Sequence, residues 1–288
     1  MARKKKNSNE EMSFLDHLEE LRWHLIRSVL AIVIIGVVAY FFKELIFNKI
    51  LFGPKDPNFV TYRAFCHLSQ KLGLDDSFCI TEIPFIVQSR TMAGQFSAAI
   101  WTSVWAGVII GFPYVLFQLW KFISPGLYEK EKRNSKGFIF IASFLFFLGV
   151  LFGYYIIAPL SINFLGNYSV SDQVQNNIDL DSYISIVRSS VISCGVVFEL
   201  PILVFFLTKI GLITPEGLRS YRKFAVVIVL ILSAIITPPD IASQIVVSIP
   251  ILILYEVSIY ISGFVLKKEK KEEERLKQEK NLTKTDNE

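Results

Sequence analysis

The chain is poor in charged residues. Only 19% of its 288 residues are Asp, Glu, Lys or Arg, whereas a soluble domain of this length carries about a quarter. Hydrophobic residues make up 52% of the chain, including 25 Phe, and they cluster in long runs. This composition excludes a soluble globular core and predicts an all-α membrane protein that crosses the bilayer several times.

Signatures of enzymes and of nucleotide binding are also missing. The sequence contains no H-E-x-x-H, no G-x-S-x-G, no P-loop and no dinucleotide fingerprint. Its three histidines, His17, His24 and His67, do not have the spacing of a metal site. The basic residues flank apolar runs, which does not support nucleic-acid binding. We therefore expect no catalytic residue, no metal, no cofactor and no nucleic-acid partner.

The N-terminal region has a basic cluster, Arg3 to Lys6, but no cleavage site of a signal peptide follows it. We therefore expect the first apolar run to stay in the mature protein. Residues 13–27 have helical periodicity, with an apolar and a polar face. The apolar face holds Phe14, Leu18, Leu21 and Leu25, and the opposite face holds Asp16, Glu20, Trp23 and Arg27. This pattern predicts an amphipathic helix at the membrane surface that continues into the first span.

Six apolar runs predict six membrane-spanning helices, each of which needs roughly 20 residues to cross the hydrocarbon. They cover about Ile26–Phe47, Ala98–Phe122, Phe138–Leu160, Tyr183–Ile210, Phe224–Ile236 and Gln244–Leu266. Pro113 predicts a kink in the second span. The fifth and sixth spans, which a Pro-Pro turn joins, are predicted to be short, the fifth distinctly so. Short spans are expected to thin the bilayer around them.

The distribution of Lys and Arg predicts the orientation of these spans. Of the 30 such residues, 23 lie in four segments: up to Arg27, Lys121 to Lys136, Lys209 to Lys223, and after Leu266. Basic residues gather on the cytoplasmic side, so we expect both termini in the cytoplasm. Residues 1–266 would form one membrane domain. Residues 267–288 alternate in charge and would form a tail that is disordered or a solvated helix.

Two carboxylates, Glu20 and Glu131, fall on this predicted cytoplasmic surface. Glu131 follows the helix start at Ser124-Pro125 and stands among lysines. At the edge of the membrane each carboxylate could hold a guanidinium group through two parallel hydrogen bonds. Each could equally be a rim charge that pairs with a neighbouring lysine.

Glu199 lies near the middle of the fourth span, in the run VVFELPILVFF. An ionisable group at that depth is costly, which favours a functional role over a structural hydrogen bond to another span. Pro201 predicts a broken helix beside it. A proton-coupled transporter of small solutes that uses Glu199 is therefore the alternative function.

Polar residues surround the T-P-P-D turn before the sixth span. Asp240 could simply cap that helix, whereas Thr237 and Gln244 could form a polar contact between spans. In the first outer loop, Cys66 and Cys79 could form a disulfide that contributes up to roughly 3 kcal/mol, or could remain free. Cys194 is expected to be an ordinary core residue.

Four motifs occur together in this order along the chain. They are F-L-D-H-L-E-E-L-R (14–22), F-I-S-P-G-L-Y-E-K-E-K-R (122–133), F-E-L-P (198–201) and T-P-P-D (237–240). Together they resemble the TatC family, the large multispanning subunit of the twin-arginine protein translocase. The resemblance covers about Ser13 to Leu266. The first outer loop departs from it, because the stretch with Cys66 and Cys79 is longer than the family usually shows.

The resemblance implies a receptor for twin-arginine signal peptides in the bacterial cytoplasmic membrane. Such a receptor works in an oligomeric complex with the single-span TatA and TatB subunits, and it exports folded proteins with the proton-motive force. The residues that match the signal-binding surface are Glu20, Glu131, Phe122 and Arg22. Those that match intramembrane polar or partner-binding positions are Glu199, Thr237, Gln244 and Asp240.

Overall fold

The structure, a computed structural model, describes residues 14–71, 73, 79–80, 82–123, 135–171, 173–174, 176–237 and 241–285. The chain divides into two compact units. One contains Met1–Lys43 and Ala99–Ser143, and the other contains Glu44–Ala98 and Phe144–Glu288. The described parts of both units are mainly helical.

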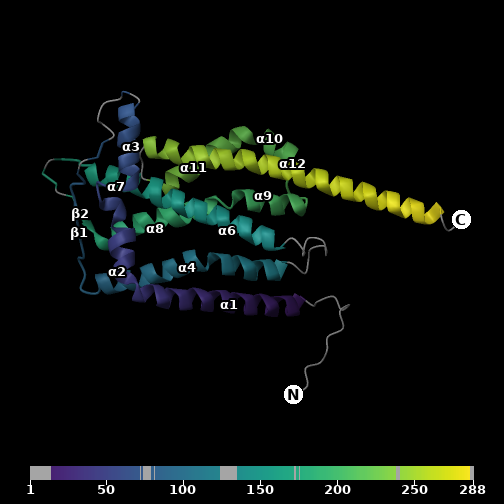
Figure 1. Cartoon of the computed structure of the whole chain (residues 1–288), viewed down its shortest axis with the longest axis horizontal. Helices are drawn as coiled ribbons and strands as arrows, with labels where there is room; N and C mark the ends of the chain where they lie inside the picture. Colours follow the sequence, from purple (N-terminus) through teal and green to yellow (C-terminus); the bar gives the residue numbers. More distant parts are fainter. Residues whose placement is uncertain are drawn as a thin grey trace, which may run out of the picture. The chain divides into compact units, whose positions relative to one another are not determined.

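The first unit is built on two long antiparallel helices, α1 (Phe14–Phe41) and α4 (Gly94–Ile123), which lie side by side (Figure 1). The start of α6 (Ser135–Phe152) also belongs to it. The two helices approach so closely that a Cβ atom added to Gly107 would lie 2.5 Å from the carbonyl oxygen of Ile32. A small residue at such a contact lets two helix backbones meet, as is typical in membranes.

The side of α1 that packs against the protein is opposite to the one a soluble helix would bury. Leu18, Leu25 and Val29 are exposed, whereas His24 and Ser28 are buried. Small or polar residues therefore face α4, and the large aliphatic ones face outward. This arrangement suits a helix in lipid, where burying leucine gains little over leaving it in the bilayer. The predicted surface helix continues without a break into the predicted first span as far as Phe41, where α1 ends.

The second unit holds the remaining elements and a two-stranded parallel sheet. Before α6 these are α2 (Lys43–Leu45), a π-helix (Ile46–Leu51), a 3₁₀ turn (Gly53–Lys55), α3 (Val60–Lys71) and β1 (Ile86–Gln88). After α6 come a π-helix (Gly153–Ile157), α7 (Ala158–Asn167), β2 (Asn177–Asp179), α8 (Leu180–Val197), α9 (Leu200–Lys209), α10 (Pro215–Ser220), α11 (Arg222–Ile236) and α12 (Ile241–Thr285). Strand β1 pairs with β2, with Val87 opposite Ile178.

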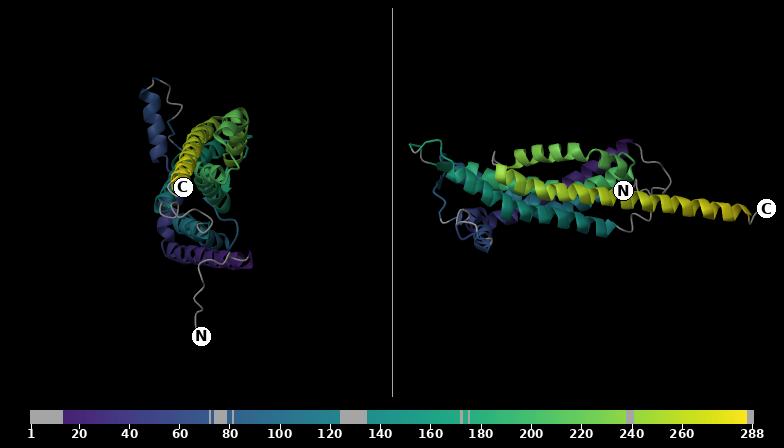
Figure 2. Two further views of the ribbon diagram at one scale, coloured as in Figure 1. Left: turned by 90° about the vertical axis from the view of Figure 1, so that its right-hand side faces the viewer. Right: turned by 90° about the horizontal axis from the view of Figure 1, so that it is seen from above.

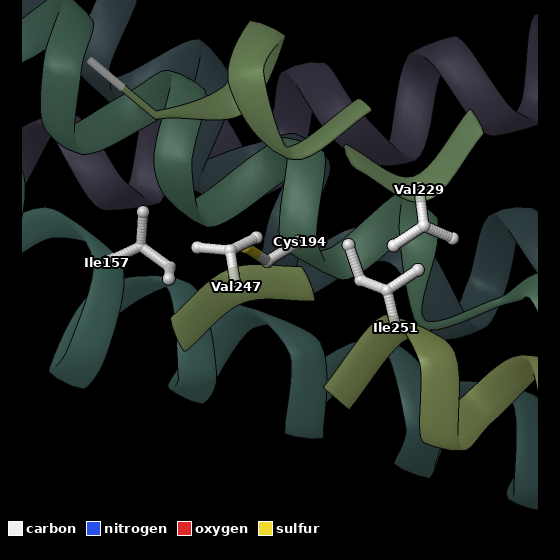
Figure 3. Close-up of a cluster of buried hydrophobic side chains, with 5 residues drawn as sticks. All are labelled: Ile157, Cys194, Val229, Val247 and Ile251. Atoms are coloured by element: carbon white, nitrogen blue, oxygen red, sulfur yellow. The ribbon is translucent and has the colours of Figure 1, made fainter. Parts of the chain in front are cut away.

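A cluster of buried apolar side chains joins the helices of the second unit (Figure 3). Its members are Ile157, Cys194, Val229, Val247 and Ile251. They come from the second π-helix, α8, α11 and α12, so the short helix α11 is held by packing against its neighbours. Cys194 is buried and free, as the sequence predicts for a core cysteine.

The predicted fourth span is broken, as Pro201 indicates. Helix α8 ends at Val197 and α9 begins at Leu200, with Pro201 in its first turn. Proline lacks an N–H group and its ring crowds the preceding turn, which explains the break at Phe198 and Glu199. The prediction of a broken helix is confirmed.

Five helical segments of the described chain are long and apolar enough to cross a membrane. They are Leu18–Phe41, Gly94–Ile123, Gly137–Asn167, Leu180–Lys209 and Ser243–Lys268. The expectation that the sixth span is short is wrong, because Ser243–Lys268 has 26 residues. Helix α11, the predicted fifth span, has only 15 residues. At 1.5 Å per residue it reaches about 22 Å, less than the roughly 30 Å of a typical hydrocarbon layer.

The charged tail after Leu266 forms a helix. The sequence leaves open whether it is disordered or a solvated helix. Helix α12 continues to Thr285, and its C-terminal part runs on beyond the ends of α9 and α11 (Figures 1 and 2). The tail is rich in Lys and Glu, which are strong helix formers. These propensities, together with the helix already formed before Lys267, favour continued helix over disorder.

Candidate functional site

The buried faces of α1 and α4 are joined by a hydrogen bond between two side chains. His24 Nδ1 lies 2.7 Å from Gln118 Oε1, and the two residues are only 8% and 4% exposed. With the amide oxygen as acceptor, Nδ1 is the donor. The His24 ring also meets the ring of Phe122 edge-on, with centroids 6.5 Å apart.

Glu20 lies one helical turn before His24 on α1. Its Oε2 atom is shielded from solvent and accepts no hydrogen bond from the described residues. A buried carboxylate oxygen without a donor is costly. The end of α1 therefore presents an acceptor that a positively charged donor would stabilise.

Arg22 lies away from this oxygen. Its guanidinium group is 3.7 Å from the carboxylate of Glu19, and both side chains are more than 60% exposed. It also lies over the ring of Trp23, 5.6 Å from the centroid. Residues two apart on a helix point in different directions. The structure therefore brings Glu20 close to the His24–Gln118 pair and leaves Arg22 on the outer surface.

Two of the predicted site residues, Glu131 and Asp240, lie outside the described residues. Thr237 and Gln244 are described, and both bond the last turns of α11. The hydroxyl of Thr237 donates to the Ser233 carbonyl at 2.8 Å. The amide of Gln244 donates to the Leu230 carbonyl at 3.0 Å. These polar side chains thus come together at one end of the short helix.

Glu199 occupies the break between α8 and α9. Its backbone carbonyl accepts from the N–H groups of Ile202 and Leu203, which starts the first turn of α9. Its Oε1 atom is buried and has no hydrogen-bond partner within the described chain. The helix break therefore carries a second carboxylate oxygen without a donor.

An ion pair between α11 and α12 could not be predicted from the sequence. The Arg222 guanidinium lies 2.7 Å from Glu256 Oε2, and the Tyr255 hydroxyl donates to the Leu218 carbonyl at 2.7 Å. These contacts tie α10 and the start of α11 to α12. The partners are 34 and 37 residues apart, so no local pattern identifies them.

The region around α3 contains a cluster of three tyrosines, Tyr62, Tyr154 and Tyr183, whose hydroxyls reach backbone carbonyls. The partners are Pro54 and Pro159 for Tyr62, at 2.8 and 2.9 Å, Ile50 for Tyr154, at 2.8 Å, and Leu51 for Tyr183, at 2.7 Å. Burial raises the pKa of Tyr62, which keeps this phenol protonated as a donor.

A disulfide joins Cys66 of α3 to Cys79. It closes the segment that the sequence analysis identifies as an extension of the first outer loop. Together with the tyrosine cluster, it fixes α3 to the rest of the second unit. The stretch between the first and second predicted spans therefore contains a helix, α3. The sequence predicts only a polar loop there.

The His24–Gln118 pair is the feature of the first unit that sequence reasoning missed. A lone histidine carries little information, and its partner is 94 residues away. One signal was available in the sequence, because Glu20, His24 and Ser28 recur every four residues along an otherwise apolar helix. Among the described residues, no group of three His, Cys, Asp or Glu side chains could hold a metal ion.

These observations define a class of protein. Several long apolar helices, with polar contacts between them, make this a multi-pass helical membrane protein. A model of the TatC family, described as Sec-independent protein translocase protein (TatC), matches residues 16–250. The chain belongs to the TatC family.

Relatives and solved structures agree with this family. A Sec-independent protein translocase protein TatC from Blattabacterium sp. subsp. Periplaneta americana is 46% identical over 264 residues, which cover 91% of this chain and 99% of that protein. The protein of the same name from Aquifex aeolicus is 35% identical over 260 residues, covering 90% and 98%. A crystal structure of the twin arginine translocase receptor TatC matches with a TM-score of 0.64 and 33% identity, covering 87% of this chain and 99% of that one.

Proposed function

We propose that this chain is the signal-peptide receptor and core subunit of a twin-arginine translocase. It would export folded proteins across the bacterial cytoplasmic membrane with the proton-motive force. Membership of the TatC family supports this proposal, as does the name of a similar solved protein, the twin arginine translocase receptor. The same membership favours a translocase over the alternative, a solute transporter that uses Glu199.

The observation that carries the proposal is the unpartnered oxygen of Glu20. This Oε2 atom is shielded from water and lacks a donor among the described residues. A guanidinium group supplies planar paired donors and keeps its charge at any physiological pH. Binding one arginine of the signal would therefore satisfy an atom that the described residues leave without a hydrogen bond.

Glu131 is proposed to hold the second arginine, with Phe122 and Arg22 on the same surface. The ring of Phe122 meets His24, one turn from Glu20 on α1, which supports including it. Arg22 pairs with exposed Glu19, so its contribution would be to the charge of the surface rather than to the arginine contact itself.

We further propose six spans with both termini in the cytoplasm, α11 serving as the short fifth span. TatA and TatB helices would dock near Thr237, Gln244 and Asp240. The hydrogen bonds of Thr237 and Gln244 to the end of α11 support a polar docking point there. Glu199 would anchor a partner helix or the inserted signal, because its Oε1 atom also lacks a donor in the described chain.

Site-specific photocrosslinking of a signal peptide to the full-length protein in detergent tests the receptor proposal. The peptide is used with its paired arginines and with paired lysines in their place. The wild-type protein is compared with Glu20→Ala and Glu131→Ala. Glu19→Ala is the matched control, since it removes a neighbouring carboxylate that is exposed and paired with Arg22.

We expect the crosslink of the arginine peptide to be lost in Glu20→Ala and Glu131→Ala and kept in Glu19→Ala. We also expect the lysine peptide to crosslink weakly to every protein, because an ammonium cannot make the two parallel bonds. Equal crosslinking in all samples would show that the two glutamates are only rim charges, and the proposed site would be wrong.

A further inference from the structure

We propose that His24 is a positioning residue for recognition of the paired arginines. Through its hydrogen bond to Gln118, it would fix the relative register of α1 and α4 and thereby hold Glu20 and Phe122 in place. This inference rests on the proposed function of Glu20. It concerns the residues behind the binding surface, which do not themselves contact the signal.

The geometry of the two helices carries the inference. Because α1 and α4 are antiparallel (Figure 1), residues that precede His24 on α1 and follow Gln118 on α4 lie toward the same end. Glu20 is four residues before His24, and Phe122 is four residues after Gln118. Each lies about one turn, or 5.4 Å, beyond the hydrogen bond. The hydrogen bond thus forms the base of the surface that bears Glu20.

Other contacts between α1 and α4 do not constrain this end equally well. The close backbone approach at Gly107 and Ile32 lies two turns further along α1. Ser28, on the same buried stripe, bonds only the carbonyl of His24 on its own helix, at 2.9 Å. The His24–Gln118 bond connects the two helices, is buried, and depends on direction as well as distance. A small slide of α4 along α1 would break it.

Precise placement matters more for arginine than for lysine. A guanidinium binds a carboxylate through two parallel bonds in a fixed plane, whereas an ammonium acts as a compact point charge. Loss of the hydrogen bond would therefore weaken binding of the arginine peptide more than binding of the lysine peptide. The expected result is a loss of discrimination between the two peptides, which general damage to the fold would not produce.

The test measures affinities of fluorescent arginine and lysine signal peptides for the full-length protein in nanodiscs. His24→Phe keeps an aromatic ring against Phe122 but has no donor. His24→Asn lacks the ring but places an amide N–H near the position of Nδ1. Gln118→Leu removes the acceptor at similar volume. Ser28→Ala is the control on the same buried stripe.

We expect the ratio of the two affinities to fall roughly tenfold in His24→Phe and Gln118→Leu, the order of one well-placed hydrogen bond to a charged site. His24→Asn and Ser28→Ala should keep most of the wild-type ratio. The ratio is taken on the folded fraction, separated by size-exclusion chromatography, so reduced yield does not alter it. His24→Asn is an independent test, because retained discrimination there assigns the effect to the donor.

Three results would overturn the inference in different ways. If Glu20→Ala abolishes discrimination while His24→Phe and Gln118→Leu leave it unchanged, the receptor proposal stands and the positioning role is wrong. If Glu20→Ala itself leaves discrimination unchanged, the proposed function fails and the positioning role fails with it. A ratio that is lost in His24→Asn and kept in His24→Phe would assign the effect to the ring and contradict the hydrogen-bond mechanism.

Discussion

The tyrosine cluster of the second unit differs from the end of α1 that carries Glu20 in the first unit. The difference is whether the polar side-chain atoms have hydrogen-bond partners. Each tyrosine hydroxyl of the cluster meets a backbone carbonyl at 2.7 to 2.9 Å. The Glu20 Oε2 atom is hidden from solvent, yet it accepts no hydrogen bond from the described residues. Within the described chain, the three tyrosine hydroxyls all have partners and this carboxylate oxygen has none.

This contrast distinguishes the tyrosine cluster from the proposed binding site. A buried polar group with its partner costs little, whereas one without a partner destabilises the protein by about 1–3 kcal/mol. Such a cost persists in proteins where a site needs the group for another purpose. Glu199 in the second unit also has a buried carboxylate oxygen without a partner in the described chain, so such an oxygen occurs in both units.

Removing the disulfide should produce the largest effect on stability. The double change Cys66→Ser and Cys79→Ser opens the loop that the disulfide closes between two positions 13 residues apart. It should lower the free energy of unfolding of the second unit by about 3 kcal/mol. Thermal unfolding in detergent, with and without a reductant, measures the effect. The reductant should destabilise the wild-type protein and leave the double variant unchanged, and equal sensitivity would contradict this prediction.

Tyr62→Phe should have a smaller effect on the stability of the second unit. It removes the hydroxyl that reaches Pro54 and Pro159 and should cost about 1–2 kcal/mol. Because the folded pKa of Tyr62 is raised, its contribution is complete below about pH 10, the unfolded value, and is lost as the pH rises toward the folded pKa. The wild-type protein should therefore lose stability above that pH more steeply than the variant. Tyr168 is exposed, so Tyr168→Phe is the control. It should change neither the free energy of unfolding nor its loss at high pH.

Glu20→Gln should have the smallest effect on stability, with the opposite sign. Replacing the unpartnered carboxylate by a neutral amide should stabilise the free protein by up to about 1 kcal/mol, while binding of the arginine peptide falls. The same measurements on exposed Glu19→Gln should show neither change. A Glu20→Gln variant less stable than the wild-type protein would mean that the carboxylate is already satisfied in the free state, and the contrast with the tyrosine cluster would disappear.

Much of the helical architecture could be predicted because long apolar runs and single prolines act locally. Pro201 predicted the break in the fourth span, and the run before Thr237 predicted a short helix, which α11 is. Strands β1 and β2 could not be predicted, since three residues each carry no periodicity. The tail after Leu266, for which the sequence leaves both disorder and a solvated helix open, is helical to Thr285, as its helix propensity favours.

The candidate site was only partly predictable for a similar reason. The carboxylates attract notice in an apolar sequence, and Glu20 and Glu199 each have an oxygen without a donor among the described residues. The residues beside Glu20 do not attract notice, because His24 and Gln118 meet across 94 positions of the chain. The sequence reveals the unusual side chain, whereas its surroundings emerge from long-range packing.

The parallel pairing of β1 and β2 has a consequence for the order of assembly. Between them the chain passes through two candidate spans, Gly94–Ile123 and Gly137–Asn167. If both candidate spans cross the membrane, they return the chain to the side that it left, and β1 and β2 lie on that same side. The two strands would then pair only after both helices have been inserted. Their pairing, beside which Arg90 donates to the Asn177 carbonyl at 2.9 Å, would be a late step of assembly.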